Sequence, residues 1–133
     1  MSQEKMEIAG GVRRLGAAFN KRDWDGFFAE LDPEVEYAPI EVHGSRRGRE
    51  ALTEYLEQWL EAWETFSAEA EEIEIAAEDR AFIAWRFRGR GKGSGVEIDD
   101  PMFWVGELRG GRLYRISEYT DRAEALEAVG LRE

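Results

Sequence analysis

The sequence predicts an α+β protein in which helices lie against a strongly curved antiparallel sheet. Three observations support this class. Apolar residues recur at helical spacing from position 52 to 63, residues 81–88 alternate between two faces as a strand does, and two glycine-containing turns join long strands in the last third of the chain. We expect the helices to cover one face of the sheet and to leave a cone-shaped cavity between helices and strands.

Length, composition and charge limit the possible functions. With 133 residues the chain is expected to form one domain, residues 1–133, and it contains no cysteine for a disulfide or a thiolate metal site. The net charge of −11 argues against nucleic acid or an anionic membrane as a partner. The start of the chain lacks the apolar core of a signal peptide, and no apolar run reaches membrane-spanning length, so we predict a cytoplasmic location.

Two helices and a short strand are predicted in the first third of the chain. The first helix carries the apolar stripe Ile8, Val12, Leu15 and Phe19. The second carries Trp24, Phe27, Phe28 and Leu31. Asp23 is the expected N-cap of this second helix, and Asp32–Pro33 should end it. Residues 34–40 then read as a short strand with Val35 and Tyr37 on one face.

The middle of the chain contains a turn-rich connection and the best-defined helix. The connection spans residues 42–49 and holds the only histidine of the sequence, His43. The helix that follows has an unbroken apolar stripe made of Leu52, Tyr55, Leu56, Trp59, Leu60 and Trp63. Such a stripe indicates a helix that covers the sheet.

The last half of the chain is predicted to be a strand meander closed by a helix. Residues 66–78 favour helix by propensity, but we expect a strand because the next strand needs a hairpin partner. Residues 81–88 form that next strand, and residues 96–108 follow with an expected bend at Asp100–Pro101. Residues 109–112 make a tight hairpin turn into the strand 113–120. Asp121 should cap a terminal helix that Gly130 closes.

Five stretches in this order carry a resemblance that spans nearly the whole chain: AFNKRDWDGFFAELDPEVEY, RGREALTEYLEQW, GRGKGSGVEI, LRGGRLYRISEYTDRAEAL and EALEAVGL. Together they resemble the SnoaL-like branch of the nuclear transport factor 2-like superfamily. The resemblance implies a cone-shaped α+β fold with an internal cavity, and a homodimer formed through the outer face of the sheet. The fold hosts isomerases, cyclases, epoxide hydrolases, dehydratases and non-catalytic binders, so it does not select an activity.

Ketosteroid isomerase chemistry is excluded by the residues at the matching positions. That chemistry requires a tyrosine, a carboxylate base and a neutral aspartic acid. Matching the motifs places Leu15 at the tyrosine, Ala38 or Pro39 at the base, and Phe103 at the neutral acid. All three roles are therefore empty.

Limonene epoxide hydrolase is more similar in the sheet. Its Arg-x-Asp pair matches Arg86-Phe87-Arg88, and its water-activating carboxylate matches Glu118 in ISEYTD. Because Arg88 replaces the acid, the two-carboxylate arrangement is incomplete. The candidate catalytic set is Glu118 as base with Arg86 and Arg88 as stabilising cations, as SnoaL-like cyclases would need to remove a proton beside a carbonyl. His43 is a second candidate base. The alternative is that the arginines and Glu118 form a structural ion-pair network.

The predicted ligand is a small, largely apolar molecule held in the cavity. The candidate wall residues are Phe19, Phe27, Tyr37, Tyr55, Trp59, Trp63, Trp104 and Tyr114. No metal or cofactor is expected, because a single histidine without a cluster of other ligands makes a poor metal site. Two functions remain open: an enzyme acting as a cyclase, isomerase or hydrolase, and a non-catalytic ligand-binding or structural dimeric protein.

Overall fold

The computed structural model describes residues 2–40, 44–77 and 79–131. The elements follow one another as α1 (Gln3–Lys21), α2 (Trp24–Ala29), β1 (Leu31–Ala38), β2 (Arg46–Arg47), α3 (Gly48–Leu60), β3 (Trp63–Ala77), β4 (Arg80–Gly91), β5 (Glu97–Arg109), β6 (Arg112–Tyr119) and α4 (Arg122–Val129). The predicted α+β class is confirmed, and the strand predicted over residues 66–78 is confirmed as far as residue 77, while residue 78 lies outside the described residues. None of the described helices is both long and apolar enough to cross a membrane.

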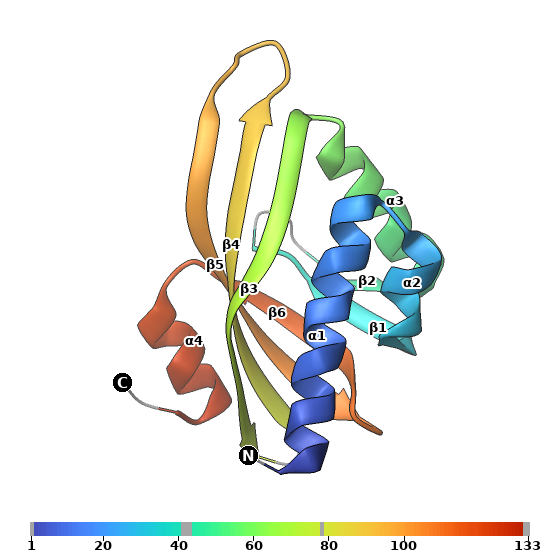
Figure 1. Ribbon diagram of the computed structural model, residues 1–133, viewed down its shortest axis with the longest axis vertical. Helices are drawn as coiled ribbons and strands as arrows, with labels where there is room; N and C mark the ends of the chain where they lie inside the picture. The colour runs from blue at the N-terminus through green and yellow to red at the C-terminus, as the bar shows by residue number, and fades with distance from the viewer. Residues whose placement is uncertain (1, 41–43, 78, 132–133) are drawn as a thin grey trace.

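The strands form one curved sheet in the order β2-β1-β6-β5-β4-β3, seen in Figure 1 with α1, α2 and α3 on one side. Neighbouring strands are antiparallel except β1 and β6, which run parallel, so the sheet is mixed. This parallel pair joins the first strand of the chain to the last. Tyr37 lies opposite Ile116 in this pairing.

The helices do not all cover one face of the sheet, and the expectation that they would is wrong for α4. The main core lies between the sheet and α1, α2 and α3, whereas α4 packs on the opposite face (Figure 1). The second core consists of Phe82, Ala84, Phe103, Ala125, Leu126 and Val129. Side chains alternate along β4, so an apolar face also exists opposite Ile83 and Trp85, and α4 covers it.

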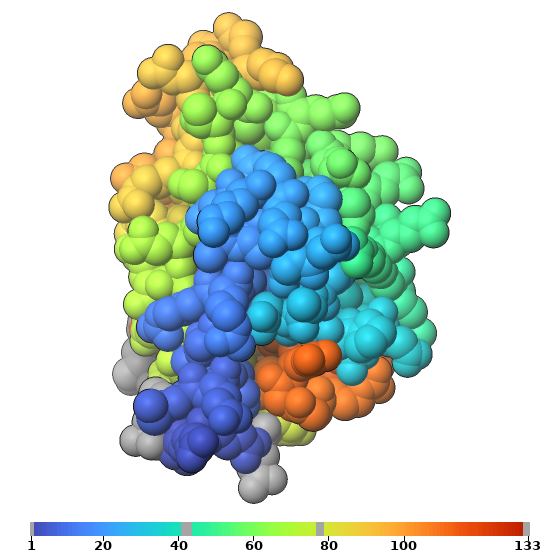
Figure 2. All heavy atoms as spheres, turned by 45° about the vertical axis from the view of Figure 1, so that its right-hand side comes forward, coloured from blue at the N-terminus to red at the C-terminus, as the bar shows by residue number. Residues whose placement is uncertain are grey.

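Helix α1 is fixed against the sheet by polar contacts with the edge strand β3 and by a close apolar contact with β4. The side-chain amide of Asn20 donates to the Ala68 carbonyl oxygen (2.9 Å) and accepts from the Ala68 backbone N–H (2.8 Å). A Cβ atom at Gly16 would come within 2.9 Å of Cζ3 of Trp85, so glycine permits this close approach of helix and sheet. Figure 2 shows α1 lying across this side of the molecule, with α2 beside it.

Helix α3 ends at Leu60, three residues before the end of the predicted stripe. The backbone N–H of Ala62 bonds to the Trp59 carbonyl, a tight final turn, and Trp63 begins β3 opposite Gly91. The ring of Trp63 still packs on Trp59, with centroids 5.6 Å apart. Trp63, a strand residue, thus continues the apolar surface of α3. For this reason the periodicity of apolar residues predicted a helix that was too long.

The predicted turns and caps of the last half are confirmed. Gly110 and Gly111 both have positive φ angles (60° and 80°), as a two-residue hairpin turn requires. Asp121 accepts hydrogen bonds from Ala123 and Glu124 at the start of α4, and Gly130 closes the helix in the left-handed conformation. Strand β5 continues through Pro101. The pairing of β5 with β6 ends at Phe103, so Pro101 pairs only with β4, and its missing N–H interrupts no ladder on the other side.

The ion pair between Arg122 and Glu72 ties α4 to β3, and its effect should depend on pH. Arg122 donates to both carboxylate oxygens of Glu72, at 2.8 and 3.0 Å, and this hydrogen bonding lowers the pKa of Glu72 below 4.5. A lowered folded-state pKa contributes stability above the unfolded value, and this contribution is lost as pH falls through the folded value.

We expect Arg122→Gln to reduce the free energy of unfolding at pH 7 by about 1 kcal/mol or less, because both side chains are partly exposed. The part of this loss that comes from Glu72 should disappear below its lowered pKa. Urea unfolding at a series of pH values from 7 down to 2 measures how the loss changes with pH. Lys5→Gln, on the exposed side of α1, is the control, and a pH-independent loss in Arg122→Gln would contradict the linkage.

Candidate functional site

The inner face of the sheet and helices α1–α3 enclose an apolar cavity with a volume of about 70 Å³. Six of the eight predicted wall residues line it: Phe19, Phe27, Tyr37, Tyr55, Trp59 and Trp104. The sequence prediction did not include Phe66, Trp85, Phe87 and Met102, which also line it. Alternation along 81–88 had already placed Trp85 and Phe87 on one face, and this signal was sufficient to find them.

Trp63 and Tyr114 are not among the described wall residues of the cavity. Trp63 packs behind the wall on Trp59 and Phe66. Near Tyr114, Leu108 lies opposite Leu113 and Glu107 opposite Arg115, so Tyr114 is the extra residue of a bulge. The bulge interrupts the alternation of side chains along β6 between Tyr114 and Glu118. Its hydroxyl lies 3.5 Å from Glu107 Oε1 instead, and the Arg109 guanidinium covers its ring.

Glu118, on β6, lines the cavity and is held there by three donors. Its Oε2 accepts hydrogen bonds from the Tyr37 hydroxyl and from Trp104 Nε1 (3.1 Å), and Oε1 accepts from the Ile40 backbone N–H (3.3 Å). Trp104 lies directly opposite Glu118 on the neighbouring strand. Tyr37 reaches the carboxylate because β1 lies next to β6. The arrangement fixes a carboxylate in an otherwise mostly apolar wall.

Tyr37 is a neutral hydrogen-bond donor in this arrangement. Burial, followed by the charge of Glu118, raises the pKa of the Tyr37 phenol well above 10. Trp85 provides another polar group at the cavity: its side chain is 2% exposed, and its indole N–H has no hydrogen-bond partner among the residues that the structure describes. A buried donor without an acceptor is uncommon in proteins.

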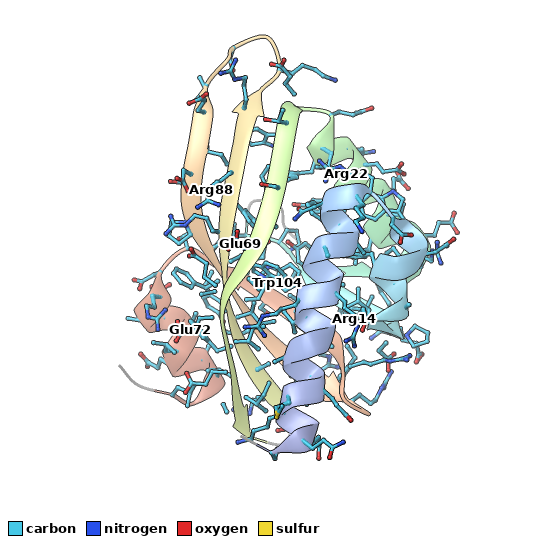
Figure 3. All side chains as sticks on the ribbon, viewed as in Figure 1. Arg14, Arg22, Glu69, Glu72, Arg88 and Trp104 are labelled. Atoms are coloured by element: carbon cyan, nitrogen blue, oxygen red, sulfur yellow. The ribbon has the colours of Figure 1, made fainter. Side chains whose placement is uncertain are left out.

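Arg86 and Arg88 lie on the other face of the sheet and are not brought to Glu118. They alternate along β4 with Trp85 and Phe87, which line the cavity together with Glu118. Figure 3 shows Trp104 between the sheet and α1, and Arg88 on the side away from α1. The hypothetical set of two arginines facing Glu118, whether catalytic or structural, is therefore not assembled.

Both arginines pair instead with acids of the neighbouring strands. Arg86 lies 3.4 Å from Glu71 and 3.7 Å from Asp99, and Arg88 lies 3.7 Å from Glu69 and 3.4 Å from Asp99. These cross-strand ion pairs on β3, β4 and β5 are partly exposed and help to fix strand register.

The remaining candidate base, His43, lies outside the described residues. Within the part of the chain that the structure describes, no group of three or more histidine, aspartate or glutamate side chains is arranged to hold a metal ion. Two described cations contact rings of the wall: the Arg22 guanidinium lies 5.1 Å from the ring centroid of Phe19, and that of Arg46, in β2, lies 5.3 Å from the ring centroid of Tyr55.

Comparison with known proteins agrees with the fold. Residues 12–116 match the family described as a SnoaL-like domain. No curated protein gives a significant match to the sequence. Among solved structures, a candidate SnoaL-like polyketide cyclase from Jannaschia sp. CCS1 is 17% identical, with a TM-score of 0.78, and the match covers 100% of this chain and 98% of that chain.

Two further structures were solved with small molecules. A hypothetical protein with a ketosteroid isomerase-like fold from Catenulispora acidiphila DSM 44928, in complex with trimethylamine, is 18% identical with a TM-score of 0.73, and the match covers 91% of this chain and 92% of that chain. TerC, co-crystallised with polyporic acid, is 16% identical with a TM-score of 0.75, and the match covers 92% and 96%. At these identities the similarity shows the fold.

Proposed function

The chain belongs to the SnoaL-like domain family, and from this premise we propose that its inner cavity binds a small, largely apolar molecule with Glu118 as the polar anchor. The observation that carries the proposal is the position of Glu118 on an aromatic wall, oriented by Tyr37 and Trp104. A largely apolar cavity with a few placed polar groups is typical of ligand sites.

The size of the cavity limits the ligand. Its volume of about 70 Å³ lies well below the roughly 300 Å³ at the lower end of common ligand pockets. The proposed ligand therefore has few non-hydrogen atoms, and a larger molecule requires the aromatic side chains to move. The complexes with trimethylamine and polyporic acid support small-molecule binding by proteins of this fold.

Binding can be tested with cyclopentanol, a small apolar molecule whose hydroxyl can donate to Glu118, by titrating the fluorescence of the wall tryptophans. We expect a saturable change in the native protein. Ala68→Leu should abolish it by filling the cavity, whereas Ala17→Leu, on the exposed side of α1, should not. A cooperative thermal melt of each variant confirms that it is folded. No saturable change, or an equal response in Ala68→Leu, would contradict the proposal.

The position of Glu118 also favours a second function, catalysis by proton removal beside a carbonyl. A carboxylate facing a cavity is placed to act as a general base. The hydrogen bonds of Tyr37 and Trp104 are directed at Glu118, so these two donors are not available to stabilise an enolate. For this reason binding is the better-supported function and catalysis the second.

Deuterium exchange at the α-carbons of cyclopentanone in D₂O, followed by proton NMR, tests the catalytic role. If Glu118 is the base, the native protein should accelerate exchange and Glu118→Gln should not. His43→Gln tests the other candidate base. Equal rates in native protein and Glu118→Gln would remove Glu118 from the mechanism.

A homodimer through the outer face of the sheet is the proposed assembly. That face carries α4 and the charged rows of β3, β4 and β5, which include Arg88 and Glu69. Light scattering should give the mass of two chains, and Arg88→Glu should lower it. A monomer mass for the native protein would contradict this assembly.

A further inference from the structure

The charge of the cavity wall indicates which class of molecule it suits, provided that the cavity binds a small molecule as proposed above. Glu118 accepts hydrogen bonds from Tyr37, Trp104 and the backbone of Ile40. Hydrogen bonds of this kind stabilise the carboxylate form. Among the described residues that line the cavity, none is a lysine or an arginine. The charge of Glu118 therefore acts within an apolar wall, where electrostatic interactions are stronger than in water.

The rings around the carboxylate add to this preference. Tyr37 packs on Trp104 at a centroid distance of 5.7 Å, and Trp104 packs on Trp85 at 5.1 Å. Trp59, from α3, lines the same cavity beside Phe66. The faces of aromatic rings carry partial negative charge and attract cations, with tryptophan the most effective. The Glu118 carboxylate and a ring face turned toward a bound molecule both favour a cation, whereas the Trp85 indole N–H, which has no partner among the described residues, favours an acceptor atom.

Other ligand classes fit this wall less well. An anion would be repelled by Glu118 and by the ring faces. A neutral hydrocarbon would displace water from the Glu118 carboxylate without offering a hydrogen bond in its place, which costs free energy. A neutral alcohol could donate one hydrogen bond to Glu118 but would gain nothing from the ring faces. A small cation with an apolar surface interacts favourably with both kinds of group.

We propose that the cavity selects a small organic cation, such as an alkylated ammonium ion, which Glu118 neutralises and the faces of Trp59, Trp85 and Trp104 surround. The cavity volume of about 70 Å³ suits an ion with a few carbon atoms around one nitrogen. Arg46 and Arg22 do not compete for these three rings, because they lie over Tyr55 and Phe19.

Two probes of similar size and shape test the charge preference: tetramethylammonium chloride and tert-butanol. Their affinities are measured by tryptophan fluorescence, with sodium chloride added to equalise ionic strength. Tetramethylammonium should bind at least about tenfold more tightly than tert-butanol, because cation–π and ion-pair contacts are available only to the cation. Glu118→Gln should remove most of this preference, because it weakens tetramethylammonium binding much more than tert-butanol binding. Glu71→Gln, on the outer face beside Arg86, should behave as the native protein.

A second variant covers the case in which Glu118→Gln fails to fold. Trp59→Leu keeps the carboxylate and removes one ring face, so it should weaken tetramethylammonium binding several-fold more than tert-butanol binding. Equal affinities for the two probes in the native protein would overturn the cation preference and leave the proposed binding function in place. Binding of cyclopentanol without binding of tetramethylammonium would also overturn the cation preference alone. No binding of any probe would overturn both.

Discussion

Phe82→Ala is expected to lower the free energy of unfolding by about 3–5 kcal/mol, the usual range for removing a large buried aromatic side chain. Phe82 is 0% exposed and stacks on Phe103, with ring centroids 6.0 Å apart and planes 18° from parallel. Arg122 covers its ring at 5.1 Å. The ring therefore lies between the sheet and α4, and its removal leaves a cavity that the backbone of a sheet cannot close.

Urea unfolding of Phe82→Ala and Phe28→Ala measures this effect against a matched control. Phe28 is only partly buried and packs on Phe27 at the surface of α2, so its loss should be about 1–2 kcal/mol. A loss of less than about 1.5 kcal/mol in Phe82→Ala would contradict the packing of α4 on the outer face.

The second core shows what a local pattern can and cannot predict. The sequence near Asp121 and Gly130 contains the capping residues of α4, and both caps are present. Caps act on the backbone within one turn, so they can be predicted from neighbouring residues. The face of the sheet on which a helix packs depends on long-range topology. Phe82 alternates with Ile83, so the sequence indicates that an apolar side chain on the second face of the sheet must be buried. The pattern does not show which helix or strand buries it.

The candidate arginines show the same limit in another form. Alternation along β4 already separated Arg86 and Arg88 from Trp85, and this local prediction is confirmed. The match to a family motif predicted that they lie beside Glu118, but a motif match does not show on which face of the sheet Glu118 lies. Because β6 contains a bulge at Tyr114, the face of each residue there could not be counted from the hairpin turn.

The partner of Glu118 could not be predicted from the sequence. Tyr37 and Glu118 are 81 positions apart, and they meet because β1 pairs in parallel with β6. No periodicity records a pairing between such distant segments. The sequence shows that both residues are polar and that each lies near the end of a strand. This is enough to name them as candidate site residues, but it does not predict that they form a hydrogen bond with each other.

Tyr37→Phe is expected to lower the free energy of unfolding by about 1.5–3 kcal/mol, the range for a hydrogen bond to a charged group. The substitution keeps the ring, which is 5% exposed, and removes only the hydroxyl that donates to Glu118. The carboxylate then keeps the N–H groups of Trp104 and Ile40 but is left with one donor fewer in an apolar wall. Urea unfolding at pH 7 measures the loss.

Tyr114→Phe is the matched control, because Tyr114 also contacts a glutamate, Glu107, but on the half-exposed outer side at 3.5 Å. Its loss should stay below about 0.5 kcal/mol. The effect of Tyr37→Phe should shrink in a Glu118→Gln background, since the two side chains share one interaction. Similar losses in Tyr37→Phe and Tyr114→Phe would mean that the bond between Tyr37 and Glu118 does not stabilise the fold.

The same bond predicts a dependence on alkaline pH whose sign follows from Tyr37. Burial and the Glu118 carboxylate raise the pKa of Tyr37, so its folded-state value exceeds the unfolded value near 10. Its contribution is therefore complete below pH 10 and is lost as pH rises toward the folded value. Because phenylalanine has no proton to lose, the stability difference between native protein and Tyr37→Phe should narrow as pH rises above 10. A difference that stays constant from pH 8 to about pH 11 would show that Tyr37 titrates as it does in the unfolded chain.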